Sequence, residues 1–185
     1  MTLNEYQQMA MRTSPRDGHD KIDNGVLGLI GETGEIIDVY KKFLYQSSIG
    51  TQLPREKIAE ELGDVMWYIA ELTDGMGARL RDIAGADFKT IDREAARRGG
   101  RSTNLRRAVM ALHRRADMIS RAVEHRARRD AANQIRRMLA RAARMAFLCD
   151  TTLEAVCAAN IEKLKARYPE GFDAEISMAR YRKGE

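Results

Sequence analysis

The 185-residue sequence contains only two cysteines and three histidines, and these fall in none of the patterns that common sites require. Cys149 and Cys157 stand eight residues apart with no C-x-x-C pair, so they suit neither a disulfide framework nor a thiolate metal site. We expect buried free thiols. The histidines have neither metal-ligand nor triad spacing, and no P-loop, G-x-S-x-G or G-x-G-x-x-G motif is present. Each histidine is therefore expected to have no catalytic role.

Long apolar runs and strand patterns are also missing. No run of 18 apolar residues occurs, and the first residues lack a basic region followed by an apolar stretch. We therefore expect a soluble, cytoplasmic protein with no membrane partner. Helical periodicity and strong helix formers dominate the sequence, which predicts an all-α helical bundle. At this length, a single domain spanning residues 1–185 is the default expectation.

Glycine, proline and polar clusters divide the sequence into expected helices. Pro54 suits a first helical turn, where its missing N–H costs nothing. Thr151 and Glu154 have the spacing of a capping box and predict the start of the last long helix. Polar residues 102–104 offer a cap for the helix that follows the Gly99-Gly100 pair. The expected helices span about 3–12, 21–46, 54–74, 78–97, 104–128, 130–148 and 152–167.

Two acidic pairs, Glu32-x-x-Glu35 and Glu61-x-x-Asp64, lie on two consecutive expected helices. Residues three apart share a helix face, so each pair projects its carboxylates in one direction. Turn residues 47–54 allow the second helix to run back along the first. At about 1.5 Å per residue, Glu35 lies roughly 16 Å before the turn and Asp64 about 15 Å after it. The pairs can face each other, although such pairs are also common on solvated helix faces.

Four converging carboxylates repel one another and call for a cation. Oxygen ligands without cysteine or histidine suit Mg²⁺, with Mn²⁺ as a substitute, and argue against zinc. Magnesium commonly shares its ligands with substrate phosphates, which points to phosphate-ester or anhydride chemistry. Beside the first pair, Gly28, Gly31 and Gly34 recur every three residues, each at roughly 1 kcal/mol relative to alanine. This stripe predicts close approach of another helix or of a ligand.

The basic residues are concentrated in one segment. Residues 93–148 contain 16 arginines and four acidic residues, a net charge of +12, while the remainder of the chain is acidic. Such density suits a polyanion. The segment has few aromatics for base stacking, so nucleic acid is not favoured as a partner, and a solvated helical face is an equal alternative.

The two halves of the chain echo each other weakly. Laying Ile58 on Ile135 and Leu62 on Leu139, then Leu80 on Leu153 after a four-residue gap, suggests a degenerate internal repeat. This register places Met138 at Glu61 and Arg141 at Asp64, so the second half would have no metal site. Similar composition alone is the alternative explanation.

Four strings of residues together resemble MazG-type nucleoside triphosphate pyrophosphohydrolases, members of the all-α pyrophosphatase superfamily. They are Leu27-Gly-Leu-Ile-Gly-Glu-Thr-Gly-Glu-Ile36, Lys41-Lys-Phe-Leu-Tyr-Gln46, Glu60-Glu-Leu-Gly-Asp-Val-Met-Trp-Tyr68 and Asn160-Ile-Glu-Lys-Leu-Lys-Ala-Arg-Tyr-Pro-Glu-Gly-Phe172. The resemblance covers a core of about 1–77 and 152–180. It departs from short family members in a helical insertion, about 78–151, which would replace a partner's helices or add an arginine wall for phosphate.

The resemblance implies Mg²⁺-dependent hydrolysis of a (deoxy)nucleoside triphosphate between its α and β phosphates, giving a monophosphate and pyrophosphate. It also implies a homo-oligomer, either a dimer or a dimer of dimers. Another interpretation is a nucleic-acid-binding or regulatory module on a catalytically lapsed scaffold, which four retained carboxylates disfavour. The implied metal-binding and catalytic residues are Glu32, Glu35, Glu61 and Asp64, and the candidates for substrate binding are Lys163, Asn160, Arg167, Tyr68 and Trp67.

Overall fold

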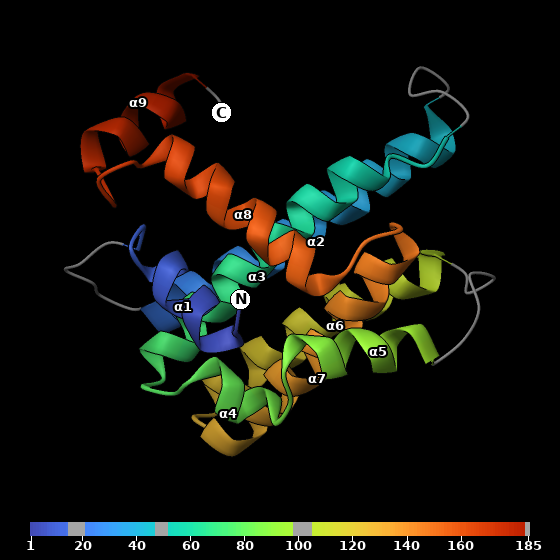
Figure 1. The fold of residues 1–185 in the computed structure, drawn as a ribbon, viewed down its shortest axis with the longest axis horizontal. Helices are drawn as coiled ribbons and strands as arrows, with labels where there is room; N and C mark the ends of the chain where they lie inside the picture. Colours follow the sequence, from blue (N-terminus) through green and yellow to red (C-terminus); the bar gives the residue numbers. More distant parts are fainter. Residues whose placement is uncertain (15–20, 47–51, 98–104, 184–185) are drawn as a thin grey trace.

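The computed structural model describes residues 1–14, 21–46, 52–97 and 105–183, and these ranges contain helices and no strand (Figure 1). The prediction of an all-α fold is confirmed. None of the described helices is long and apolar enough to cross a membrane. The helices are α1 (Leu3–Met11), α2 (Lys21–Tyr45), α3 (Arg55–Gly75), α4 (Leu80–Ala84), α5 (Phe88–Arg97), α6 (Leu105–Glu124), α7 (Arg128–Leu148), α8 (Leu153–Arg167) and α9 (Ala174–Lys183).

Helices α2 and α3 form the predicted antiparallel pair. Lys21 at the start of α2 pairs with Asp74 near the end of α3, with Nζ and Oδ2 2.7 Å apart. A Cβ added to Gly25 would lie 2.8 Å from the Leu72 Cβ, so the missing side chain allows the two backbones to approach. Part of the predicted turn, residues 47–51, lies outside the described residues. Both helices supply apolar side chains to the core, among them Leu29, Ile36, Leu62, Val65 and Ile69.

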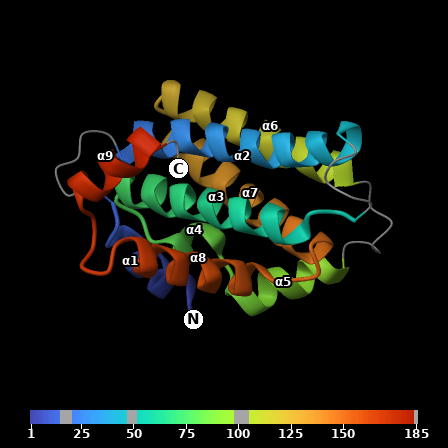
Figure 2. The same ribbon diagram turned by 90° about the horizontal axis from the view of Figure 1, so that it is seen from above.

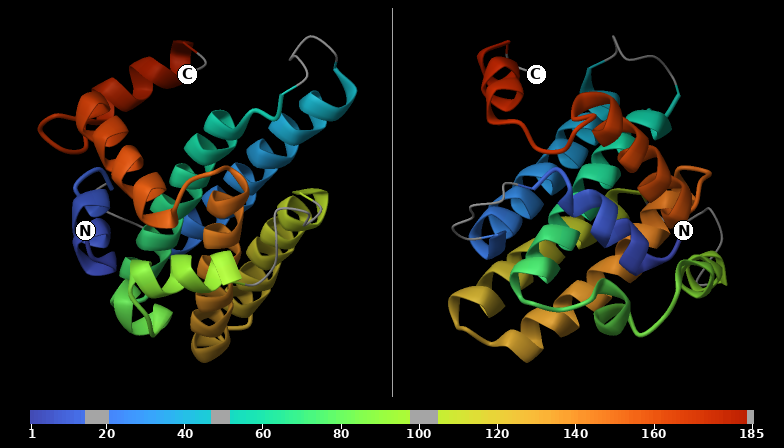
Figure 3. Two further views of the ribbon diagram at one scale, coloured as in Figure 1. Left: turned by 45° about the vertical axis from the view of Figure 1, so that its right-hand side comes forward. Right: turned by 60° about the vertical axis from the view of Figure 1, so that its left-hand side comes forward.

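The arginine-rich segment, residues 93–148, contains a second helical hairpin, α6 and α7, which packs against the first (Figure 3). Helix α6 lies on α2, where the Thr33 Oγ1 and His113 Nδ1 atoms are 2.9 Å apart. The candidate caps at 102–104 lie outside the described residues. Apolar side chains of this hairpin join the same continuous core as α2 and α3, including Val109, Leu112, Ile119, Ile135 and Leu139.

Helices α1, α5 and α8 connect the hairpins to the rest of the chain. Helix α8 packs on α3, with α1 against both, while α5 packs on α7 (Figure 2). Helix α8 therefore contacts α3 of the first hairpin, and α5 contacts α7 of the second hairpin.

Three details differ from the sequence prediction. The helix expected over 78–97 is divided into α4 and α5, because Gly85 adopts a left-handed conformation with φ of 68°. Asp87 then starts α5, since its Oδ1 accepts a hydrogen bond from the Thr90 N–H at 2.8 Å. Helix α8 is capped one residue later than predicted, by Thr152, whose Oγ1 accepts from the Ala155 N–H. Helix α9 was not predicted.

Cys149 and Cys157 are buried free thiols, as predicted. Burial raises the pKa of the Cys149 thiol to about 11 and that of Cys157 well above its ordinary value. A protonated thiol is a poor nucleophile and metal ligand. Neither cysteine therefore contributes to the chemistry considered below.

Candidate metal centre

Three of the four predicted carboxylates meet between α2 and α3. Glu32, Glu61 and Asp64 each offer an oxygen, and these three atoms lie within 4.8 Å of one another. Glu32 comes from α2, and the other two lie one turn apart on α3. The antiparallel hairpin therefore brings both acidic motifs to one place, as their spacing predicts.

Glu35 does not join this cluster. Its side chain is exposed, and the length estimate that set it opposite Asp64 placed the helices about one turn out of register. The close contact at Gly25 and the ion pair between Lys21 and Asp74 fix the register instead. Glu32 consequently faces Asp64, and Glu35 lies about one turn further along α2, towards the connection between α2 and α3.

The three carboxylates carry more negative charge than their surroundings neutralise. Burial and, after it, the nearby Asp64 and Glu61 together raise the pKa of Glu32 to about 7, with partial compensation from Lys163. Among the described residues, no hydrogen bond or ion pair reaches the Glu32 carboxylate. An uncompensated, partly buried carboxyl next to two others is the electrostatic condition under which a cation binds favourably.

Asp64 is held by side chains from α8. The Lys163 Nζ donates to both Asp64 oxygens at 2.6 Å. The Asn160 Nδ2 donates to Asp64 Oδ1 at 3.0 Å. Behind Asn160, the buried Tyr6 hydroxyl donates to the Asn160 Oδ1 at 3.1 Å. Both predicted residues of the N-x-x-K motif therefore contact the acidic centre, and Tyr6 supports them from α1.

Gly63 sets the distance between α8 and the acidic centre. A Cβ added there would lie 3.0 Å from the Asn160 Cβ and 3.2 Å from its Nδ2, tighter than almost any real contact. The absence of a side chain at this position lets α8 approach closely enough for Asn160 to reach Asp64. The reason for glycine between Glu61 and Asp64 is thus steric.

A groove of about 390 Å³ runs beside this centre between α3 and α8. Lys57 on α3 forms ion pairs with two carboxylates, its Nζ lying 2.9 Å from Glu61 Oε1 and 3.0 Å from Glu60 Oε2. The pKa of Glu60 is lowered chiefly by the Lys57 hydrogen bond, with smaller contributions from Lys163 and Arg167. Arg167 is partly buried near the end of α8. We call this space the α3–α8 groove; its polar lining includes Arg55, Glu56, Glu60, Asn160 and Lys163.

The two predicted aromatics occupy different environments. The Trp67 indole N–H donates to the Ala10 carbonyl at 3.1 Å and to the Thr13 Oγ1 at 2.9 Å, so this ring joins α3 to α1. Tyr68 packs against Gly28, where an added Cβ would collide with its ring. Burial, followed by Glu32, raises the pKa of the Tyr68 hydroxyl to about 12. Tyr68 therefore borders the acidic centre, whereas Trp67 faces away towards α1.

The glycine stripe is explained only in part. Gly28 accommodates Tyr68, which confirms the predicted close approach at that position. Gly31 and Gly34 have no neighbour within 4 Å of an added Cβ among the described residues, so no packing constraint requires glycine there.

Comparison with known proteins gives one partial match. Over 66 residues the chain is 41% identical to "Gene 37 protein" of Mycobacterium phage L5, which covers 35% of this chain and 58% of that protein. The matched region is thus shorter than two thirds of the relative. No protein-family model matches the chain. No solved structure matches it either.

Proposed function

We propose that this protein hydrolyses (deoxy)nucleoside triphosphates between the α and β phosphates in a Mg²⁺-dependent reaction, releasing a monophosphate and pyrophosphate. The observation that carries the proposal is the meeting of Glu32, Glu61 and Asp64 next to Asn160 and Lys163. These residues lie in three of the strings that resemble MazG-type enzymes. The described geometry brings them together from three different helices, which supports a shared task.

The donor set fits a magnesium ion. Glu32, Glu61 and Asp64 offer carboxylate oxygens only, within a span of 4.8 Å, and no thiol or imidazole belongs to the group. Hard oxygen ligands of this kind suit Mg²⁺, and Mn²⁺ as its substitute. When bound, such an ion neutralises phosphate charge and lowers the pKa of a coordinated water. Glu35 is close enough to influence the pKa of Glu32 but lies outside the group.

The residues of α8 are suited to holding Asp64 and the phosphates. Lys163 pairs with Asp64, and its three donors would also suit a phosphate oxygen if a cation neutralised Asp64. Asn160 fixes the orientation of the Asp64 carboxylate, with its own amide fixed by Tyr6. Arg167 lies one turn after Lys163, and we propose it for a more distal phosphate.

The two aromatic residues near the site differ in whether they are available to contact the nucleoside. Trp67 uses its N–H to bind α1, so we assign it to packing rather than to base stacking. Tyr68 borders the acidic centre and is the better candidate for contacting the nucleoside. Base and sugar preference depend on pocket shape and are left to the substrate panel.

A substrate panel tests this proposal. Purified protein with Mg²⁺ and each (d)NTP should release monophosphate and pyrophosphate, and EDTA should stop the reaction. Asp64→Asn and Glu61→Gln should each lower kcat/KM by at least about 100-fold, because even outer-shell partners of a metal contribute 10–100-fold. Glu162→Gln is the matched control, since Glu162 is exposed on α8 and pairs with Lys165. Release of orthophosphate without pyrophosphate would refute the assigned bond.

A further inference from the structure

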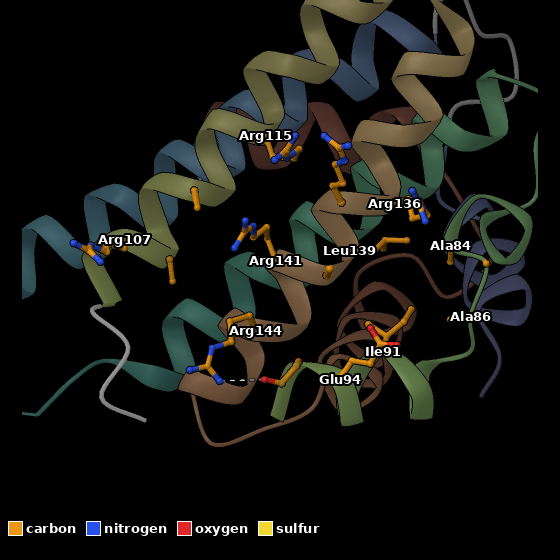
Figure 4. Close-up of a pocket in the computed structure, with 16 residues that line it drawn as sticks. Ala84, Ala86, Ile91, Glu94, Arg107, Arg115, Arg136, Leu139, Arg141 and Arg144 are labelled. Atoms are coloured by element: carbon orange, nitrogen blue, oxygen red, sulfur yellow. Dashed lines mark hydrogen bonds between the residues drawn. The ribbon is translucent and has the colours of Figure 1, made fainter. Parts of the chain in front are cut away.

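A second pocket, of about 800 Å³, lies between α5, α6 and α7. Arginines from two helices surround it: Figure 4 shows Arg107 and Arg115 on α6 and Arg136, Arg141 and Arg144 on α7. The wall formed by α4 and α5 is mostly apolar and contributes a single carboxylate, Glu94. We call this space the arginine pocket; its arginines are Arg107, Arg115, Arg136, Arg137, Arg141 and Arg144.

The positive charge in this pocket is largely uncompensated. Arg144 donates to the Ala95 carbonyl and stacks on Phe147, so it is a fixed part of the wall. For the other five, no ion pair with a carboxylate occurs among the described residues. Like charges held this close repel one another, which lowers stability unless an anion binds between them.

Arg115 shows the effect of this repulsion most directly. It donates through Nη1 to the Gln134 side chain, yet its Nε is buried and has no hydrogen-bond partner within the described residues. Burial, followed by Arg137 and Arg141, lowers the pKa of the Arg115 guanidinium. Buried donors are nearly always satisfied in folded proteins, so an orphan N–H beside an open pocket indicates a missing acceptor.

Part of the arginine pocket corresponds to the α3–α8 groove when α7 is aligned with α3. Laying Ile58 on Ile135 shifts α3 onto α7 by 77 residues. In this register three groove-lining residues of α3, Ala59, Glu60 and Gly63, fall on three pocket-lining residues of α7, Arg136, Arg137 and Ala140. On the facing walls, Ala159 of α8 falls on Ala86, in the short connection between α4 and α5, in the register that lays Leu153 on Leu80.

The charge is reversed at one of these matched lining positions and at one neighbouring position in the same register. Glu60 corresponds to Arg137, and Asp64 corresponds to Arg141. Carboxylates in the first hairpin need a bound cation before they can hold a phosphate. Arginines in the second hairpin can donate hydrogen bonds to phosphate oxygens without a cation.

We propose that the arginine pocket binds a small polyphosphate anion directly, without a metal ion. The pocket is a concave space bounded by three helices, which suits a compact ligand better than an extended strand. No aromatic side chain belongs to its described lining, so recognition is of phosphate rather than of a base. The small side chains of Ala108, Ala111 and Ala140 leave the room that a chain of two or three phosphates needs. The site does not depend on the proposed hydrolysis.

Calorimetric titration in EDTA tests the proposal without involving the metal centre. Tripolyphosphate should bind the wild-type protein, and the double variant Arg137→Gln/Arg141→Gln should weaken binding at least tenfold. Both residues are exposed, so the fold should survive. The matched control is Arg106→Gln/Arg114→Gln, which removes two exposed α6 arginines outside the pocket and should weaken binding less than about threefold, because distant charges are screened.

Further arms of the titration identify the ligand and the site. A nucleoside triphosphate should bind within about threefold of tripolyphosphate, because the pocket offers nothing to the base. Glu61→Gln should leave metal-free binding unchanged. Without ligand, Arg141→Gln should raise the melting temperature, since it relieves repulsion around Arg115.

Three results would overturn the proposal. Absence of tripolyphosphate binding to the wild-type protein would do so directly. Equal weakening by both double variants would show that diffuse surface charge, and not the pocket, attracts the anion. Tight binding of a single-stranded oligonucleotide that both double variants weaken equally would assign the arginines to an extended nucleic-acid surface.

Discussion

Replacing Glu32 with glutamine should stabilise the metal-free protein at pH 8 and change its stability little at pH 5. Burial, Asp64 and Glu61 raise the pKa of Glu32 in the folded protein to about 7, from an ordinary value of 4.5. A carboxyl with a raised folded-state pKa favours folding below its unfolded pKa, and this contribution is lost as pH rises through the folded pKa. Above pH 7 the ionised Glu32 therefore disfavours folding, whereas glutamine carries no charge.

The size of the effect follows from the two pKa values. The difference between 4.5 and about 7 corresponds to roughly 3 kcal/mol at 1.36 kcal/mol per pH unit. Because the carboxyl is only partly buried, solvent screening reduces this to about 1–2 kcal/mol. At about 2–4 °C per kcal/mol for a protein of this size, the melting temperature at pH 8 should rise by about 2–8 °C.

Urea denaturation in EDTA at the two pH values measures this difference. Glu35→Gln is the control on the same helix, and because Glu35 is exposed outside the cluster its substitution should change the free energy of unfolding by less than about 0.5 kcal/mol. A gain from Glu32→Gln that is equal at pH 5 and pH 8, or absent at pH 8, would refute the electrostatic reasoning. Saturating Mg²⁺ should stabilise the wild-type protein more than the variant, and equal stabilisation would exclude Glu32 as a ligand.

Three further substitutions separate packing from chemistry. Gly63→Ala should lower the free energy of unfolding by about 1–3 kcal/mol, measured in urea, and reduce (d)NTP hydrolysis, because the added Cβ pushes against Asn160. Gly31→Ala, at an open helix position, should instead be neutral or stabilising by up to about 1 kcal/mol. Trp67→Phe should lower the free energy of unfolding by about 1–2 kcal/mol, because the indole hydrogen bonds are lost. It should leave KM for the (d)NTP within about twofold. A tenfold rise in KM would instead show that Trp67 stacks on the base.

The sequence predicted the helices well because each carries its own apolar periodicity. It did not predict the register between α2 and α3, since counting residues to a turn gives axial position but not the contacts that lock two helices together. Those contacts involve Gly25 and Gly28, and only the second belongs to the glycine stripe singled out from the sequence. The result was a shift of one turn, which exchanged Glu35 for Glu32 opposite Asp64.

The members of the site that come from far along the chain were harder to predict. Asn160 and Lys163 were found through resemblance, whereas Tyr6 sits in an ordinary amphipathic helix and reaches Asn160 across 154 positions. No local pattern distinguishes such a tyrosine from any buried aromatic. Gly63 did offer a signal, because a glycine inside a strong helix requires a reason, and close approach of α8 is that reason.

Both pockets are lined by helices from different parts of the chain. The α3–α8 groove combines α3 of the first hairpin with α8, which follows the second hairpin, and the arginine pocket combines α5, which precedes the second hairpin, with α6 and α7. Residues 1–77 contain Glu32, Glu61 and Asp64 but lack Lys163 and Asn160, so a fragment with the complete acidic cluster would still lack its support from α8. Helices α6 and α7 pack against the first hairpin and precede α8 in the chain, so the acidic cluster gains Asn160 and Lys163 only where the chain returns to α3.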